Sequence, residues 1–443
     1  MGLYQTTLQA RYPNLHQLPG PKPRFPLGNL LDMRAQPLWQ LSADLRQNHG
    51  PFALLWLVNQ PLVFVHDPLA IGEILGAKSA AFYKHEPVAA MNPALRAVTT
   101  FTANGAEWQQ MRRASFLSRP DFGTWLADSF EPSRTFLQTE LQKRLPVHGK
   151  LDAFLFRLVF DLTSQMTLGS VLSDEAFSAY NDMMDVINLR ISTNLPVLPP
   201  TFARRKALWF QAVEAAVEQA RLEPDGTSMA HHFARHSRQS RVEQVNMMAN
   251  VFPGGVWSVT AALTELLTNL HQHPEIQQPL RTELAKLSQD PQTQYANLQY
   301  LELLEQSLRE TMRISPPVPA FMRRVKADSV QVGGVTLDRG VRVAIGVFPL
   351  HHDPQHWPKP GEFLPERWTP EVMAQNPYGS DYFFPFGRGE RACHGGEMAL
   401  FQLRVLTLAL LGNPARTVQP EPAKAQTYYF GVRMPKGVDG QIA

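Results

Sequence analysis

The 443-residue chain contains a single cysteine, Cys393. One thiol cannot form an intramolecular disulfide, and it cannot supply a cysteine-rich zinc or iron–sulfur site. The formal net charge of +3 is too small to indicate a nucleic-acid-binding protein. No stretch is long and apolar enough to span a bilayer, and the first residues carry no signal-peptide core. We therefore expect a soluble, cytoplasmic protein, for which a peripheral membrane contact remains possible.

The residues around Cys393 argue against the ordinary role of a lone cysteine, which is that of a small buried hydrophobe. Glycines and Arg391 surround the thiol, and the aromatic segment 382–386 precedes it. Residues 397–411 are predicted to form a buried helix. A cysteine just before such a helix lies at the positive end of the helix dipole, which favours the thiolate. A lone thiolate is well suited to be an axial ligand of haem iron.

Segment 386–395 reads Phe-Gly-Arg-Gly-Glu-Arg-Ala-Cys-His-Gly, which resembles the F-G-x-G-x-R-x-C-x-G signature of the cytochrome P450 (haem-thiolate) superfamily. The resemblance implies haem b as the cofactor, with Cys393 as the axial ligand of its iron. It also implies that Arg391 pairs with a haem propionate. The remaining residues of this cofactor-binding loop are Phe386, Gly387 and Gly395. His394 stands where the family prefers an apolar residue, and we expect its ring to face solvent rather than to tune the reduction potential.

A second group of matches concerns the scaffold of the haem-binding core. Glu310 and Arg313 are spaced so that they share one face of a helix. Arg367 lies in a Pro-Glu-Arg-Trp segment further along the chain. By resemblance to the family, these three residues form a structural triad rather than part of the chemistry.

Three further residues match positions that bind the haem propionates in the family. Trp108 and Arg112 form a W-x-x-x-R pattern, in which one helical turn brings the indole and the guanidinium to the same side. Arg323 matches a third propionate-binding position, and the adjacent Arg324 is expected to be a surface charge. The resemblance extends over residues 18–435.

The predicted fold is mainly α with a minor β part. Helical periodicity is clear over residues 154–172, 242–270, 298–313 and 397–411. Short alternating runs within residues 52–66 and 330–347 predict strands of a small sheet. By resemblance, residues 1–443 form a single large haem-binding unit with the cytochrome P450 fold, and residues 1–17 are an N-terminal extension.

The helix that activates oxygen departs from the family pattern, which is [AG]-G-x-[DE]-T. The corresponding segment is residues 254–258, in which Gly254 and Gly255 match and open space for oxygen. Trp257 replaces the acid, and Ser258 replaces the threonine. An indole N–H is only a donor, so it cannot shuttle protons as a carboxylate does.

This departure leaves several functions open. In the favoured hypothesis, the protein is a monooxygenase whose proton relay runs through Ser258 and ordered waters. Alternatively, it is an atypical haem-thiolate enzyme that uses peroxide, or an isomerase or dehydratase that acts on a preoxidised substrate. A haem protein that binds a ligand without turnover is the alternative from a different class.

The predicted substrate is a hydrophobic small molecule, because the positions that line the family's pocket are almost all apolar here. Plain core packing is the alternative for each of these residues, which are Phe252, Val256, Val318, Ala320, Phe321 and Phe430. No charged anchor for a substrate carboxylate is evident. The other expected partners are O2 and an acidic ferredoxin or flavodoxin-type reductase, which basic residues near the thiolate would attract. We expect a monomer.

Overall fold

The computed structural model describes residues 10–84, 93, 99–193, 198–236, 239–287, 289–429 and 431–443. The chain divides into two compact units, and it passes from one to the other after Glu86, Leu308 and Cys393. One unit comprises Met1–Glu86 and Arg309–Cys393, and the other comprises Pro87–Leu308 and His394–Ala443. The predicted fold class is confirmed, because helices dominate and the strands form small sheets. A single domain over residues 1–443 stays a prediction.

The first unit is built around a five-stranded sheet. Its strands, in spatial order, are β1 (Phe52–Leu57), β2 (Gln60–Val65), β8 (Arg342–Gly346), β5 (Ala320–Val325) and β3 (Phe82–Lys84). Strands β2 and β8 are parallel, and the other neighbours are antiparallel. A separate hairpin pairs β6 (Ser329–Val332) with β7 (Val335–Asp338), and its turn is formed by two glycines with positive φ.

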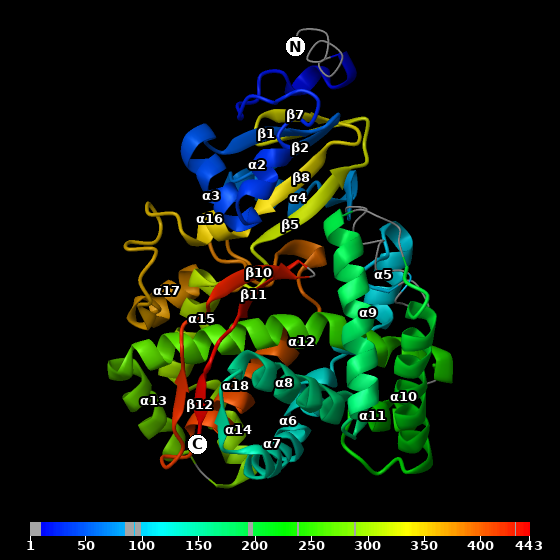
Figure 1. The fold of residues 1–443 in the computed structure, drawn as a ribbon, viewed down its shortest axis with the longest axis vertical. Helices are drawn as coiled ribbons and strands as arrows, with labels where there is room; N and C mark the ends of the chain where they lie inside the picture. Colours follow the sequence, from blue (N-terminus) through cyan, green and yellow to red (C-terminus); the bar gives the residue numbers. More distant parts are fainter. Residues whose placement is uncertain are drawn as a thin grey trace. The chain divides into compact units, whose positions relative to one another are not determined.

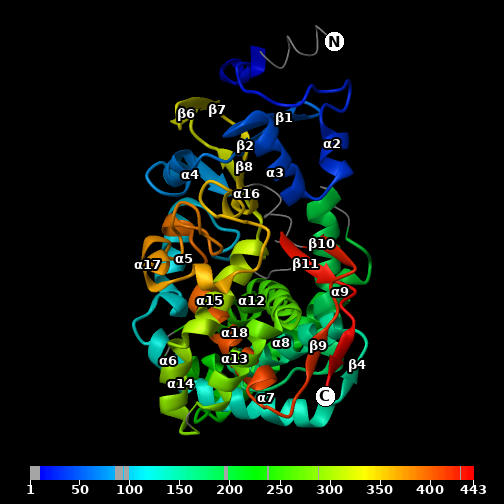
Figure 2. The same ribbon diagram turned by 90° about the vertical axis from the view of Figure 1, so that its left-hand side faces the viewer.

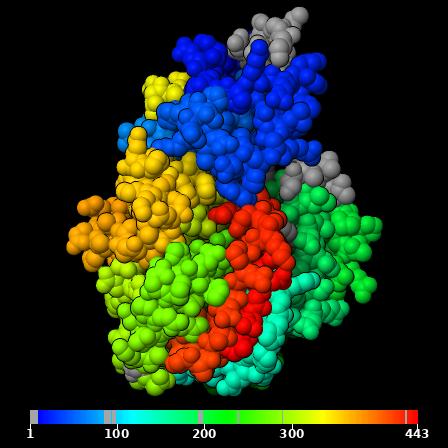
Figure 3. All heavy atoms as spheres, turned by 60° about the vertical axis from the view of Figure 1, so that its left-hand side comes forward, coloured from blue at the N-terminus to red at the C-terminus, as the bar shows by residue number. Residues whose placement is uncertain are grey.

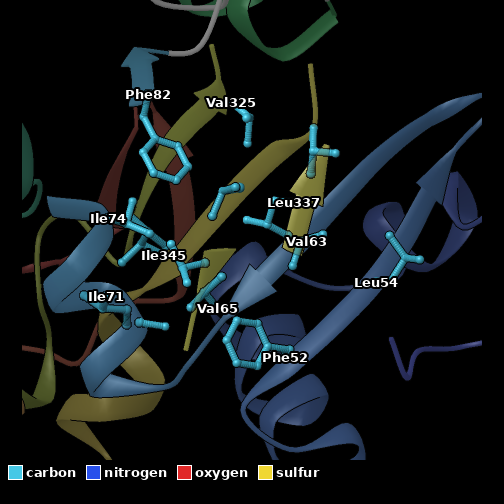
Figure 4. Packing of buried hydrophobic residues seen from close by; sticks show 14 of the residues in the cluster. Phe52, Leu54, Val63, Val65, Ile71, Ile74, Phe82, Val325, Leu337 and Ile345 are labelled. Atoms are coloured by element: carbon cyan, nitrogen blue, oxygen red, sulfur yellow. The ribbon is translucent and has the colours of Figure 1, made fainter. Parts of the chain in front are cut away.

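Both faces of this sheet carry apolar side chains, because alternate residues of a strand point to opposite faces. One face packs against α4 (Pro68–Leu75), and Figure 4 shows Ile71 and Ile74 of this helix beside Val65 and Ile345. The other face holds a second apolar cluster that includes residues of α3 (Leu38–His49). Other helical segments of the first unit include α2 (Leu30–Ala35), α16 (Val347–His351), α17 (Pro370–Gln375), short 3-10 turns and the end of α15 (Glu302–Ile314).

The second unit is a helical assembly around α12 (Arg241–Gln272). Ser240 and Glu243 form a capping box at the start of this helix. Helix α12 packs against α8 (Leu151–Leu168), α10 (Phe202–Leu222) and α18 (Gly396–Leu411), and Figure 1 shows α8 and α18 beside it. The other helices are α5 (Gly105–Ala114), α6 (Phe122–Asp128), α7 (Phe130–Arg144), α9 (Asp174–Thr193), α11 (Met229–His236), α13 (Pro274–Ala285) and α14 (Pro291–Gln299).

Two small sheets complete the second unit. Strands β10 (Ala425–Tyr429) and β11 (Val432–Lys436) form a hairpin that packs on α12. Strands β4 (Val147–His148), β12 (Gly440–Ile442) and β9 (Val418–Pro420) form a three-stranded sheet, which is seen beside α7 in Figure 2. The C-terminal segment, drawn in red, forms part of the molecular surface in Figure 3.

The predicted elements are largely present, with one clear error. The helix predicted over residues 298–313 is in fact the end of α14 followed by α15 (Glu302–Ile314). The chain leaves the helical path at Tyr300, which caps α14 with the non-helical φ and ψ values of −109° and 8°. In the part of the chain that the structure describes, no helix combines the length and the apolar character needed to cross a bilayer.

Candidate functional site

The loop around Cys393 is shaped by close backbone approaches. Gly387 and Gly389 have φ values of 71° and 70°, which glycine adopts without strain. A Cβ atom at Gly389 would lie 1.9 Å from the carbonyl oxygen of Leu75, so only glycine lets the loop approach the end of α4. The backbone N–H of Cys393 donates a hydrogen bond to the carbonyl of Phe386 at 2.7 Å. This bond closes the loop, and the Cys393 side chain is exposed.

Side chains also tie the loop to the rest of the first unit. The hydroxyl of Ser79 donates to the Glu390 carboxylate at 3.0 Å. Arg388 pairs with Asp381 across the loop, and its guanidinium lies against Gly72 of α4. The thiol is therefore presented by a loop that is held at both its backbone and its side chains.

The aromatic segment before the loop is held by His351, for which the sequence pattern predicted no function. The ring accepts a hydrogen bond from the backbone N–H of Phe384 at 3.0 Å, and its other nitrogen lies 3.3 Å from the carbonyl of Met312. Burial, reinforced by His352 and Arg313, lowers the pKa of His351 to about 3. The imidazole is therefore neutral and can accept this bond. Only the three-dimensional arrangement identifies this function.

The predicted triad residues meet in the interior of the first unit. Both oxygens of Glu310 accept hydrogen bonds from Arg313, at 2.8 and 2.9 Å, and Arg367 donates at 2.9 Å. The N–H groups of Leu364 and the Trp368 indole complete the coordination of the carboxylate. Burial opposes ionisation of Glu310, but these hydrogen bonds and positive charges outweigh it and hold its pKa below the usual value. The carboxylate is thus ionised and fully coordinated.

Arg323 and Arg324 point to opposite faces of the five-stranded sheet, because they are neighbours on β5. Arg323 is half-buried, and burial, reinforced by Arg391, lowers the pKa of its guanidinium to about 10. Its guanidinium donates to the backbone carbonyl of Met322, and no carboxylate of the described residues pairs with it. Arg324 is also half-buried and donates to the carbonyl of Gly340 at 3.2 Å, so it is not the free surface charge that was predicted.

In the second unit, α5 carries Trp108, which is buried, and Arg112, which is half-buried. The hydroxyl of Ser118, just beyond this helix, lies 2.8 Å from the Nε2 atom of His394. Burial, with a contribution from Arg112, lowers the pKa of His394 to about 4. The ring is half-buried and hydrogen-bonded, so the prediction that it simply faces solvent is wrong.

The predicted oxygen-activation segment lies in the middle of α12. A Cβ atom at Gly254 would contact nothing within 4 Å, which shows open space beside the helix at this point. Ser258 is half-buried, and its hydroxyl donates to the carbonyl of Gly254 at 2.8 Å. Gly255 is similarly open, because a Cβ atom there would meet only a Val251 methyl group, at 3.8 Å. The Ser258 hydroxyl therefore lies next to the open space beside Gly254 on this helix.

Trp257 occupies a different environment from Ser258. It is buried, and its ring centroid lies 4.4 Å from that of Phe156 on α8. The Lys436 ammonium of β11 lies 6.0 Å from the ring centroid. Burial raises the pKa of Tyr180, and the nearby Trp257 indole acts in the opposite direction. Trp257 is thus enclosed by side chains of the second unit.

The predicted pocket residues fall into two groups. Phe252 and Val256 are fully buried, and the Phe252 ring packs against Phe160 and Trp209, which is the arrangement expected of core packing. In the first unit, Ala320 is buried, whereas Val318 and Phe321 are half-buried. The ring of Phe321 would lie 3.4 Å from a Cβ at Gly387, so it contacts the cysteine loop. Phe430 lies outside the described residues.

Comparisons with known proteins place these observations in context. The family profile described as cytochrome P450 matches residues 18–436. The chain is 25% identical to cytochrome P450 3A16 of Mus musculus over 89% of its length and 84% of the relative. It is also 25% identical to cytochrome P450 3A5 of Homo sapiens, over 93% of the chain and 87% of the relative. A shorter match, 34% identical, covers 40% of the chain and 35% of cytochrome P450 3A9 of Rattus norvegicus.

Proposed function

Because this chain belongs to the cytochrome P450 family of haem-thiolate monooxygenases, we propose that it transfers one oxygen atom of O2 to a hydrophobic small molecule. We further propose that an acidic ferredoxin or flavodoxin-type reductase supplies the electrons. The observation that carries the proposal is the first unit's combination of the chain's only thiol, Cys393, with the half-buried cations Arg323 and Arg391. A thiolate and a pair of guanidiniums match the iron and the propionates of haem.

The residues present fit a haem group. Arg323 has no carboxylate partner among the described residues, and burial together with Arg391 makes its positive charge costly. An anion at this position would remove that cost, and a propionate is an anion of suitable size. Cys393 would bind the iron, and Phe386, Gly387 and Gly395 would shape the loop. By resemblance to the family, Trp108 and Arg112 stay predicted propionate partners.

When bound, haem would supply the redox chemistry by which dioxygen is cleaved. The protein residues would hold the haem and the substrate in place and would deliver protons. The loop bond between Cys393 and Phe386 holds the ligand backbone in place. The start of α18, three residues further on, presents its positive dipole end toward the preceding loop and favours the thiolate. The triad of Glu310, Arg313 and Arg367 contributes a rigid scaffold rather than a reacting group.

Proton delivery is assigned to Ser258 rather than to Trp257. The Ser258 hydroxyl donates to the Gly254 carbonyl, so its lone pairs can accept a hydrogen bond from water, and its own O–H would turn away from this carbonyl when it passes a proton on. The open space at Gly254 gives room for such a water. Trp257 is enclosed beside Phe156 and Tyr180 and cannot carry a proton in the manner of a carboxylate. A relay that uses the serine and water therefore supports monooxygenase chemistry without an acid.

The proposed substrate is hydrophobic because the half-buried candidates Val318 and Phe321 are apolar. The proposed electron donor is acidic because Arg113, next to the propionate residue Arg112, is exposed. Exposed positive charge raises the encounter rate with an acidic partner.

Product formation from a panel of hydrophobic compounds tests the proposal. One reaction contains O2, NAD(P)H and a surrogate ferredoxin–reductase pair, and the parallel reaction contains hydrogen peroxide alone. We expect product only in the first reaction. The matched variants are Ser258→Ala, which should lower turnover by roughly 10- to 100-fold, and Trp257→Phe, which should change it little.

Turnover with peroxide alone would overturn the O2-dependent function and favour a peroxygenase. Silence in both reactions, with an intact thiolate–haem spectrum, would favour an isomerase, a dehydratase or a ligand binder. A large loss of turnover in Trp257→Phe, with Ser258→Ala unaffected, would contradict the assignment of the proton relay.

A further inference from the structure

Two arginines from different parts of the second unit meet at the carboxyl end of α18. Arg281 belongs to α13, which lies beside α18 (Figure 2), and its Nη1 group donates to the carbonyls of Leu411 and Asn413 at 3.2 and 3.5 Å. Arg416 lies in the loop after α18, and its Nη1 group donates to the carbonyl of Ala409. These bonds satisfy carbonyls that a helix leaves unpaired in its last turn. The pair therefore caps α18.

The positive charge of the pair exceeds what the end of the helix can balance. The carboxyl end of a helix carries about half a negative charge, whereas Arg281 and Arg416 each carry a full positive charge. Burial lowers the pKa of both guanidiniums, and the charge of Arg416 adds to this effect at Arg281. In the part of the chain that the structure describes, no carboxylate forms an ion pair with either arginine. Such a charge is costly unless an anion balances it.

The pair also keeps hydrogen-bond donors that no described residue uses. The Nε and Nη2 groups of both guanidiniums make no hydrogen bond with the described residues. Both side chains are half-buried, and the adjacent loop residues 413–415 are exposed, so these donors are accessible from the solvent.

A third donor lies one turn before Arg281 on α13. Gln277 and Arg281 share a face of this helix, because side chains at i and i+4 are neighbours. The Gln277 side chain is only 7% exposed, and its Nε2 group has no hydrogen-bond partner among the described residues. A buried polar group of this kind is normally hydrogen-bonded, so an acceptor that also contacts the arginines would satisfy it.

The unbalanced charge indicates the class of anion. After the helix dipole is taken into account, roughly one and a half positive charges remain at the pair. A phosphate group carries roughly −1.5 to −2 charges at pH 7, and guanidiniums bind it through parallel hydrogen bonds. We propose that Arg281, Arg416 and Gln277 form a binding site for a dianionic phosphate group. Free phosphate and a phosphomonoester share this chemistry. The site goes beyond the proposed function, because it involves neither the haem nor the substrate.

Calorimetric titration of the haem-loaded ferric protein tests the site without turnover. The probes are inorganic phosphate, glycerol 3-phosphate and, as the singly charged control, acetate, all at one ionic strength because salt screens exposed charges. We expect both phosphate compounds to bind at least about tenfold more tightly than acetate. An unchanged haem absorption spectrum during each titration shows that the anion does not bind at the iron. The phosphate compound that binds more tightly identifies the source of the group.

Two variants and a matched control locate the binding. Arg281→Gln and Arg416→Gln should each weaken phosphate binding by about tenfold or more. The control is Arg134→Gln, because Arg134 of α7 is also half-buried but pairs with Glu131 of the same helix. This control should leave phosphate binding unchanged.

Two further variants keep the test decisive if the loss of a helix cap prevents folding. Arg281→Lys keeps the positive charge but lacks the planar guanidinium, so it should fold and weaken phosphate binding by about threefold. Gln277→Leu replaces the buried amide with an apolar side chain of similar volume. It should therefore not lower the melting temperature, but it should weaken phosphate binding by about threefold.

Three results would overturn the proposal. Equal binding of acetate and phosphate would show that the pair attracts anions without recognising a phosphate group. Phosphate binding that survives Arg281→Gln and Arg416→Gln in folded variants would show that the anion binds elsewhere. If neither of these variants folds, unaltered phosphate binding in both Arg281→Lys and Gln277→Leu would lead to the same conclusion.

Discussion

Two sets of arginines in the first unit differ in how their charge is balanced. Arg313 is completely buried, and its guanidinium bonds both oxygens of Glu310 and the carbonyls of His351 and Pro360. Arg323 and Arg342 are only half-buried, yet neither has a carboxylate partner among the described residues. Depth of burial therefore does not explain the difference, because the deepest arginine is the best compensated.

The comparison suggests how a structural network differs from a binding site in this protein. The network around Glu310 is saturated, so nothing remains for a ligand to bind. Arg323 and Arg342, which we call the sheet arginines, have no carboxylate partner among the described residues. An incoming anion would accept hydrogen bonds from them and balance their positive charge. Changes in the saturated network should therefore affect folding, whereas changes in the sheet arginines should affect ligand retention.

The largest effect is expected from Glu310→Gln. The variant keeps the shape but leaves Arg313 and Arg367 without their anion, and breaking a buried ion pair typically costs about 3–5 kcal/mol. We expect little folded, haem-loaded protein, measured by denaturant unfolding and haem content. Glu302→Gln on the same helix is the control, because Glu302 is exposed and its loss should cost less than about 0.5 kcal/mol. Equal stability of the two variants would show that the hydrogen-bond network around Glu310 is not a structural network distinct from the sheet arginines.

The next effect concerns haem retention rather than folding. Arg323→Gln removes one proposed propionate partner, so haem should transfer to an acceptor apoprotein about tenfold faster. Arg323→Lys keeps the charge but lacks the planar guanidinium, so its rate of haem transfer should lie between those of the unmodified protein and Arg323→Gln. Arg324→Gln is the matched control, because its side chain lies on the opposite face of β5 and should leave the transfer rate unaltered. Faster transfer from Arg324→Gln than from Arg323→Gln would reverse the assignment.

Acid should destabilise the saturated network in two stages. Burial lowers the pKa of His351 from 6.5 to about 3, so only the unfolded state takes up this proton below about pH 6.5, and stability falls as the pH decreases. The pKa of Glu310 is held below 4.5, so its contribution is present above that pH and is lost as the pH falls through the folded-state value. Melting temperatures between about pH 7 and pH 4.5 measure the first stage, and a series continued to about pH 2 measures the second.

The variant His351→Phe separates the two stages of acid destabilisation. It should be less stable at neutral pH, because the N–H of Phe384 loses its acceptor. Its melting temperature should nevertheless change less between about pH 6.5 and pH 4.5. An unchanged pH dependence would show that His351 does not contribute to acid sensitivity.

The smallest effect is expected at the bond between Ser118 and His394. Ser118 is exposed, so Ser118→Ala should cost no more than about 1 kcal/mol in denaturant unfolding. Ser118→Thr keeps the hydroxyl and serves as the control. A loss of about 3 kcal/mol or more would show that this contact is as important as the buried network.

The sequence predicted those features that depend on local spacing. The glycine-rich loop at Cys393, the helical i, i+3 pair of Glu310 and Arg313, and most helices follow from short patterns. The error at residues 298–313 arose because the apolar periodicity continues across Tyr300, although the helix does not. Periodicity alone carries no information on where packing stops.

Features that depend on register or on distant contacts were not predictable. The separation of Arg323 from Arg324, and the pairing of Arg324 with Arg342, require the alignment of β5 with β8. The function of His351 depends on an N–H group 33 residues away. The contact of His394 with Ser118 spans 276 residues, so the sequence could give only the chemistry of each side chain.

Ligation of haem iron by Cys393 is tested most directly by the absorption spectrum of the ferrous protein with bound carbon monoxide, compared between the unmodified chain and Cys393→Ser. We expect the thiolate-type spectrum for the unmodified protein and its loss in the variant, because Cys393 is the chain's only thiol. A thiolate-free spectrum in the unmodified protein, or an identical spectrum in both proteins, would contradict this ligation.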